Sequence, residues 1–205
     1  MTRSDLITRV KIKLDEYTPS PGVALPFESY IGPLLDESAN DITARGPLRL
    51  LAPIAIPLTE VAYLADKSYI PVPVNYVKLY EIKYPLWKKS VRIAISQENP
   101  AYKIQENEYI KGGYARPSVA VVNTSISGGL VMKYFECSKV VDPGTGTLTP
   151  IALYVKTTLP EELNDQFVEA LSWLCCSKVL AVMGYNDKAS SAMEQANNSI
   201  LALTV

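Results

Sequence analysis

Histidine is absent from all 205 residues of the chain. Because histidine is the side chain that ordinarily changes charge near neutral pH, its absence excludes Ser-His and Cys-His nucleophile pairs, HExxH zinc sites and imidazole acid–base catalysis. Carboxylate, lysine or Ser-Lys chemistry stays open. The sequence therefore closes the commonest routes to catalysis but leaves a few.

Cysteine and basic charge are also scarce. The only cysteines are Cys137, Cys175 and Cys176, whose odd number and spacing fit neither a disulfide framework nor a zinc signature, and this favours a reducing compartment. The first 16 residues carry charges throughout, so we expect no signal peptide. With 20 basic and 21 acidic side chains there is no excess of the kind that marks nucleic-acid wrapping. We expect no metal and no cofactor.

The longest apolar run, "EALSWLCCSKVLAVMG", is too broken to span a membrane. Glu169, Ser172, Ser177 and Lys178 interrupt it, whereas a bilayer requires about 20 nearly uninterrupted apolar residues. At helical spacing its apolar side chains lie all round the axis, which predicts burial on more than one face, in part against a neighbouring subunit. Its two cysteines project about 100° apart in mid-helix, so we interpret them as packing residues.

Helices at both chain ends enclose a strand-rich middle. The expected class is α+β, in a single domain in which helices from both ends pack as a bundle. Its segments are N-terminal helices at 1–50, a β-rich insertion at 51–158 and C-terminal helices at 159–205. We expect Ser4 to cap the first helix, Gly32-Pro33 to kink or restart the second, and Gly46-Pro47 to end it. The third helix should open at Leu159-Pro160 under a Thr158 cap and end at Gly184, and Asp187 should cap the last.

Alternating apolar residues predict about five antiparallel strands in the middle segment, as one sheet or a small sandwich or barrel. The clearest are "VRIAIS", "SVAVVN", "LVMKYFEC" and "IALYVKTT". "NTSISGG" separates the second from the third, and "DPGTGT" separates the third from the fourth as a hairpin connection.

Four motifs have a functional and a structural interpretation. "GTGT" at 144–147 lacks the lysine and the helix start of a phosphate loop. The acidic pairs at 15–16, 36–37 and 161–162 fit solvated helix faces and ends. "WKKSVR" at 87–92 is a compact basic cluster that suits DNA, an acidic partner or a solvated strand. Eight tyrosines between 63 and 114 favour a binding surface or simply strands.

Three segments together carry a resemblance to a known family. They are the opening "DLITRVKIKLDE" and "SYIGPLLDESANDI", the middle "PLWKKSVRIAISQENPAYKIQENEYIKGGYARPSVAVV", and the closing "EALSWLCCSKVLAVMGYNDKASSAMEQANNSI". In this layout the chain resembles the head-to-tail connector (adaptor, or ring) proteins of tailed bacteriophages. It is most similar to the ring proteins of crAss-like phages and more distantly similar to the tail tubular protein A of short-tailed phages.

The resemblance implies a structural virion protein, not an enzyme, that is assembled in the host cytoplasm and resides in the particle neck. It implies a ring of roughly twelve copies below the portal protein, with heterologous contacts between neighbours. The helical part would dock on the portal, the β part would face the next tail or ring protein, and genomic DNA would pass through the channel without sequence-specific binding. The alternatives are a soluble enzyme using carboxylate or lysine chemistry, and another tail-assembly protein such as a stopper or terminator.

We expect the subunit interfaces to include the apolar third helix, the small residues of the last helix and aromatic residues of the middle segment. The candidate residues are Trp173, Leu180, Ala189, Ala192, Met193, Ala196, Tyr80, Tyr84 and Trp87. On this interpretation Ala192→Trp or Trp173→Asp should block ring assembly more than it unfolds the monomer.

Overall fold

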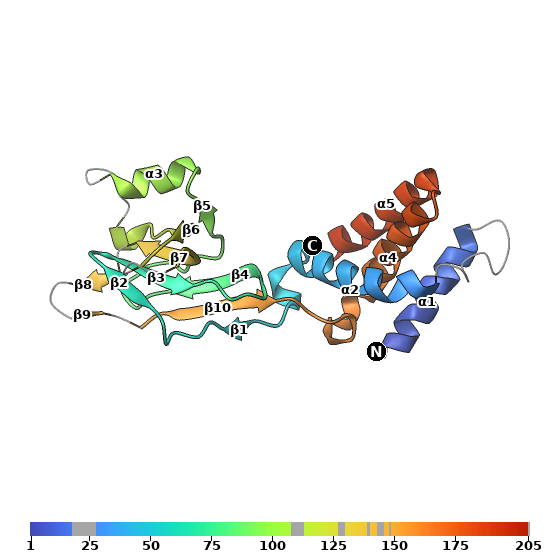
Figure 1. The fold of residues 1–205 in the computed structure, drawn as a ribbon, viewed down its shortest axis with the longest axis horizontal. Coiled ribbons are helices and arrows are strands. Elements are labelled where there is room, and N and C mark those ends of the chain that lie inside the picture. The colour runs from blue at the N-terminus through green and yellow to red at the C-terminus, as the bar shows by residue number, and fades with distance from the viewer. Residues whose placement is uncertain are drawn as a thin grey trace. The chain divides into compact units, whose positions relative to one another are not determined.

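The computed structural model divides the chain into two compact units (Figure 1). Met1–Ala52 and Thr157–Val205 form the helical unit, and Pro53–Lys156 forms the β unit. The structure describes residues 1–17, 28–107, 113–126, 130–138, 140–142, 146–147 and 149–204. Residues 18–27, Tyr109 and parts of the connecting stretches "NTSISGG" and "DPGTGT" lie outside this range. The α+β class is confirmed, and helices from both chain ends pack together.

Four α-helices build the helical unit, and the chain ends supply two each (Figure 1). They are α1 (Arg3–Tyr17), α2 (Glu28–Arg45), α4 (Val168–Val182) and α5 (Asn186–Ala202). Three short 3₁₀ turns flank them: η2 (Leu48–Leu50) follows α2, and η4 (Pro160–Glu162) and η5 (Asp165–Phe167) precede α4. Helix α4 is the one that packs against each of the other three.

Helix α4 is buried by its own chain. Nine of its residues are buried, and they lie all round the axis, as its apolar sequence predicts. The two buried hydroxyls donate to carbonyls, Ser172 to Val168 at 2.7 Å and Ser177 to Ala189 at 2.7 Å, so neither leaves an unsatisfied polar group. The expectation that a neighbouring subunit must cover this helix was therefore wrong, because α1, α2 and α5 cover it.

Helix α1 is capped two residues earlier than expected. The hydroxyl of Thr2 accepts a hydrogen bond from the Asp5 amide at 3.2 Å, and the Asp5 carboxylate accepts one from the Thr2 amide at 3.1 Å. This reciprocal pair is a capping box and replaces the expected Ser4 cap. The apolar stripe expected on this helix comprises Leu6, Ile7, Val10 and Leu14, of which Ile7 is half-buried and the other three are buried.

Helix α2 runs continuously through Gly32-Pro33, so the expected restart there was wrong. Pro33 lies near the amino end of the helix, where few backbone hydrogen bonds are lost, and the fully buried Ile31 and Leu35 on either side hold that turn against the core. The predicted stop after the helix is confirmed, since α2 ends at Arg45 and the Gly46 amide still reaches the Ile42 carbonyl at 2.7 Å.

The third helix begins later than Leu159-Pro160. Residues 160–162 form only the isolated turn η4, and the side chain of Asn164 caps η5 by accepting from the Gln166 amide at 3.0 Å. Thr158 is not a cap: its amide donates to the Asn40 side chain at 3.3 Å. The proline and the two acids at 160–162 therefore begin only a short turn. Asn164, which the sequence analysis did not single out, caps the turn that leads into α4.

The junction between α4 and α5 is a tight turn at Gly184. This residue has φ of +83°, the left-handed conformation predicted for a glycine that ends a helix. Helix α5 then starts after Tyr185, whose side chain makes no capping hydrogen bond. Asp187 lies inside the first turn instead of capping it, where its charge still favours the positive end of the helix dipole.

Two sheets and a hairpin form the β unit, so the single sheet among the expected alternatives is excluded (Figure 1). One sheet has the order β1-β10-β4 and the other β2-β3-β7-β6-β5. Their bounds are β1 (Ile54–Ala55), β2 (Ala62–Leu64), β3 (Lys67–Pro71), β4 (Tyr76–Lys83), β5 (Ile95–Ser96), β6 (Val119–Thr124), β7 (Met132–Ser138) and β10 (Ile151–Lys156). The hairpin pairs β8 (Val141–Asp142) with β9 (Gly146–Thr147).

Three details of the expected sheet were wrong. Strand β5 pairs with β6 in parallel, not antiparallel. Strands β7 and β10, which "DPGTGT" was expected to join as a hairpin, belong to different sheets, and that stretch holds the separate β8–β9 hairpin. Val91 makes only a single bridge, to Ile82. The alternating pattern found strands but did not indicate which of them pair.

A common hydrophobic core joins the two larger sheets. Ile70 and Phe135 enter it from the five-stranded sheet, and Leu79, Ile82 and Tyr154 enter it from the three-stranded sheet. On another part of the five-stranded sheet lies α3 (Pro100–Glu106), a helix that the sequence reading missed (Figure 1). Its signal was present, because "ENP" places a capping asparagine directly before a first-turn proline.

Gly46 gives a test of the helical packing. A Cβ atom at this position would lie 2.8 Å from the ring of Phe167, which is fully buried, and 2.9 Å from the Ile42 carbonyl. We therefore predict that Gly46→Ala lowers the free energy of unfolding by about 1–3 kcal/mol through overpacking, measured by denaturant titration of the helical circular dichroism signal. In a Phe167→Leu background the same substitution should cost less, and an equal cost in both backgrounds would contradict the contact.

Candidate functional site

Six of the nine expected interface residues are core residues of one copy. Burial removes them from any contact with a partner, so their assignment to an interface was wrong. They are Leu180, Ala189, Ala192 and Ala196 in the helical unit, and Tyr84 and Trp87 in the β unit. Trp173, Met193 and Tyr80 are half-buried.

Trp173 is engaged within its own unit. Its ring meets Tyr17 edge to face with centroids 5.9 Å apart, and the ammonium of Lys13 lies 3.7 Å from its centroid. Ala192 is fully buried, so Ala192→Trp would overpack the contact of α5 with α4 and unfold the unit. Trp173→Asp and Ala192→Trp therefore both disturb packing within one copy and cannot distinguish a loss of assembly from a loss of folding. Surfaces for a partner are formed by exposed residues.

The cysteines are confirmed as packing residues. All three are buried and free, and burial raises the pKa of the Cys137, Cys175 and Cys176 thiols to about 12. A thiol with so high a pKa is almost entirely protonated at neutral pH, and the nucleophilic form is the thiolate. Cys175 donates weakly to the Ile31 carbonyl, with 3.8 Å between sulfur and oxygen.

Two of the three acidic pairs meet at Arg3, and the Asp36, Glu37 and Glu161 carboxylates of these two pairs are matched with cations. Asp36 receives both terminal nitrogens of Arg3, at 2.6 and 2.8 Å, and Glu37 pairs with Lys178 at 2.7 Å. Glu161 lies 3.6 Å from Arg3, and residues 15–16 are exposed at the end of α1. Within the described ranges there is no group of three or more cysteine or carboxylate side chains that could hold a metal. None of the helices described is both long enough and apolar enough to cross a bilayer.

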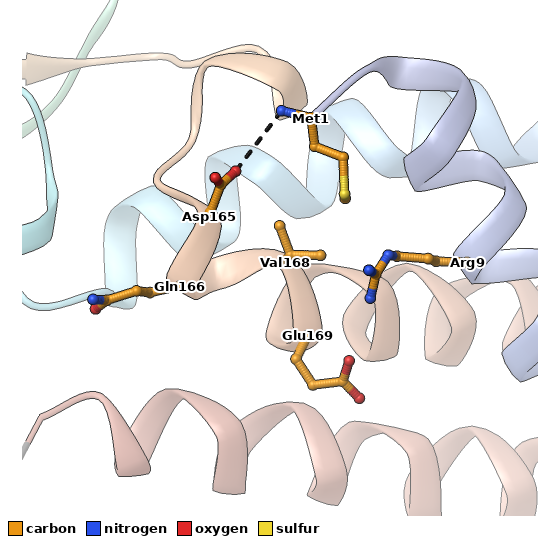
Figure 2. Close-up of a pocket in the computed structure, with 6 residues that line it drawn as sticks. All are labelled: Met1, Arg9, Asp165, Gln166, Val168 and Glu169. Carbon is orange, nitrogen blue, oxygen red and sulfur yellow. Dashed lines mark ion pairs between the residues drawn. The ribbon is translucent and has the colours of Figure 1, made fainter.

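One pocket of about 510 Å³ lies in the helical unit, between the start of α1 and the start of α4 (Figure 2). The amine of Met1 lies 3.8 Å from Asp165, and Val168 points between Met1 and Arg9, whereas Gln166 points away (Figure 2). Glu169, at the lower rim, is paired with Lys13 at 2.5 Å. The two carboxylates are thus matched with cations, and the pocket offers no buried polar group for a substrate.

The "WKKSVR" motif forms an ordered loop between Lys83 and Arg92, called here the basic loop. Its centre is fixed because the buried Trp87 packs on the buried Tyr84, with ring centroids 5.1 Å apart. The Tyr84 hydroxyl is hydrogen-bonded to Ser68, and burial raises the pKa of Tyr84, so the hydroxyl stays neutral. The two amide–carbonyl bonds between Ile82 and Val91, at 2.8 and 2.9 Å, close the base of the loop.

The basic loop exposes charge and apolar surface together. Lys83, Lys88, Lys89 and Arg92 are exposed, and the sequence contains no acid between 82 and 97. The Lys88 amide donates to the Tyr114 carbonyl at 3.0 Å, which places the exposed Arg116 close by. No carboxylate of the described ranges is ion-paired with any of these five cations. Exposed apolar side chains flank them, Leu86 at 38% and Ile93 at 76% of full exposure.

A second exposed surface lies at the end of the β6–β7 hairpin and is called here the hairpin-tip patch. Leu130, Val131 and Met132 are exposed to 86%, 70% and 47%, and Val74 is fully exposed. The Val72 amide donates to the Lys133 carbonyl at 3.0 Å, so the β3–β4 turn that carries Val74 runs beside β7. Grouped large apolar side chains in water are typical of a contact surface.

Charge is divided unequally between the two units. The helical unit has eight basic and thirteen acidic side chains, a net charge of −5. The β unit has twelve basic and eight acidic side chains, a net charge of +4. The formal charge of −1 for the whole chain is therefore the sum of two units with opposite net charge.

No family model matches the chain, and no curated protein matches its sequence. The candidate site therefore consists of the exposed surfaces described above, the basic loop and the hairpin-tip patch. Sequence reasoning found the basic loop as a charge cluster, but it did not find the flanking apolar residues, Arg116 or the hairpin-tip patch. Those depend on which turns the sheets bring to the surface.

The thiols give a test of the buried α4. We predict that a thiol reagent such as dithiobis-nitrobenzoate labels less than one cysteine per folded chain at pH 8, because each thiol is buried and protonated. Unfolding in guanidinium should release all three. Rapid labelling of Cys175 or Cys176 in the folded protein, with unchanged circular dichroism, would contradict the packing described for α4.

Proposed function

We propose that this protein is a structural, non-enzymatic subunit of a ring in the head-to-tail connector of a tailed bacteriophage. The ring lies below the portal protein and surrounds a channel through which genomic DNA passes. The observation that carries the proposal is the division of the chain into a helical unit built from both ends and a β unit inserted between them, each with its own core. This is the arrangement that the resemblance in sequence implies.

The surface supports this proposal in two ways. A ring subunit contacts neighbours on two sides and further components above and below, so it requires several separate contact surfaces. The basic loop and the hairpin-tip patch are two such surfaces on the β unit, and both combine order with exposure. The net charge of −5 on the helical unit also suits a channel wall, because dense lysine would bind the DNA phosphates and hold a molecule that has to slide.

Electron microscopy tests the proposal directly. Purified protein mixed with the portal protein should give an annulus of identical subunits stacked on the portal ring. Particles in which the portal ring stays bare, or turnover of a substrate by the purified chain, would contradict it. A stopper or terminator would also bind in the neck, and its position relative to the portal distinguishes these cases.

The hairpin-tip patch provides a surface-specific prediction. Leu130→Ser with Val131→Ser should leave the annulus on the portal intact but weaken binding of the next tail component at least tenfold, because two exposed apolar side chains lose their burial in that contact. The matched control is Leu64→Ser with Ile104→Ser, two exposed apolar residues elsewhere on the β unit. Equal losses in both variants, measured by co-sedimentation, would show that the patch has no special role.

A further inference from the structure

Resting on the proposed ring, we propose that the basic loop of one copy docks on the exposed face of α5 in the next copy. The contact is heterologous, since it joins two different surfaces, and a contact of this kind closes into a ring when the rotation per subunit is right. It assigns the lateral interface to exposed residues, in place of the buried ones that the sequence suggested.

The basic loop is suited to docking because it is ordered before it binds. Buried Trp87 and Tyr84 and the bridge between Ile82 and Val91 hold its backbone, so little conformational entropy is lost on association. Its cations carry no competing ion pair within the described ranges. Leu86 and Ile93 supply apolar area beside the charges, which is the composition of an interface centre with a polar rim.

The exposed face of α5 has the complementary properties. Asp187 and Glu194 are exposed and lie seven residues apart, so they lie on one side of the helix two turns from each other. The only base of α5, Lys188, is turned to its own unit, where it donates to the Tyr17 carbonyl at 2.5 Å. A shallow groove of about 450 Å³ between α5 and α4 includes Met193 and Glu194, and so places an apolar side chain beside a carboxylate.

Charge selects the second copy as the occupant rather than a nucleic acid. The chain as a whole has a net charge of −1, so it offers a polyanion no net long-range attraction. A second copy presents its helical unit, with a net charge of −5, to the β unit with its net charge of +4, so the opposite signs attract and orient the two copies. The unequal division of charge between the two units thus favours head-to-tail association of copies.

Charge reversal tests the contact. We expect the loop variant, Lys88→Glu with Lys89→Glu, and the helix variant, Asp187→Lys with Glu194→Lys, each to weaken self-association by about tenfold or more in sedimentation velocity at low salt. Combining all four substitutions in one chain should restore association, since an acidic loop then meets a basic helix. Mixing the two variants in equal amounts should restore it as well, through alternating copies.

The matched control is Lys103→Glu with Lys133→Glu, which changes the net charge of the β unit as much as the loop variant does, at exposed sites outside the basic loop. It should associate like the wild type, and circular dichroism should show all variants folded. Association that is unchanged in the loop and helix variants overturns the inference, while an annulus on the portal would still uphold the proposed ring. Loss in the loop variant without rescue, accompanied by loss of binding to a 30-base-pair DNA duplex, also overturns it and assigns the loop to nucleic acid.

Discussion

Burial of helix α4 on all sides is the constraint on which the rest of the structure depends. Its apolar residues are distributed round the whole axis, so it is stable only when other helices surround it. Helices α1 and α2 from the start of the chain and α5 from its end provide this cover. The two ends are thereby brought into one unit, and Pro53–Lys156 forms a second compact unit, with its own core between two sheets.

Because one copy completes its own core, any contact between copies has to be made by surface residues. The surface features that can drive association are exposed apolar side chains and charged groups, and both are distributed unevenly over the chain. The β unit holds the basic loop and the hairpin-tip patch, and the helical unit carries the acidic excess. Contacts made of such surfaces are polar and screened by salt, so they suit subunits that fold first and join afterwards on a template.

Sequence reasoning was most successful where local physics decides the outcome. The α+β class, the buried cysteines, the end of α2 before Gly46 and the left-handed Gly184 all follow from side-chain periodicity or backbone preference. It failed where distant segments decide. Neither the partner of β10 nor the parallel pairing of β5 can be read from an alternating pattern. Part of the cover of α4 was assigned to a neighbouring subunit because two of the three helices that provide it, α1 and α2, lie more than a hundred residues earlier in the chain. The sequence revealed the lysine pair of the basic loop, but it did not reveal the turn that exposes this pair.

The central claim is that several identical copies, each complete in its own core, close into a ring around a channel in the particle neck. Cryo-electron microscopy of the neck of the native particle tests it most directly. The account predicts a rotationally repeated density in which every repeat holds the four-helix unit, with α4 enclosed by α1, α2 and α5 of its own chain. A single copy in the neck, or an α4 covered by helices of a neighbouring subunit, would contradict it.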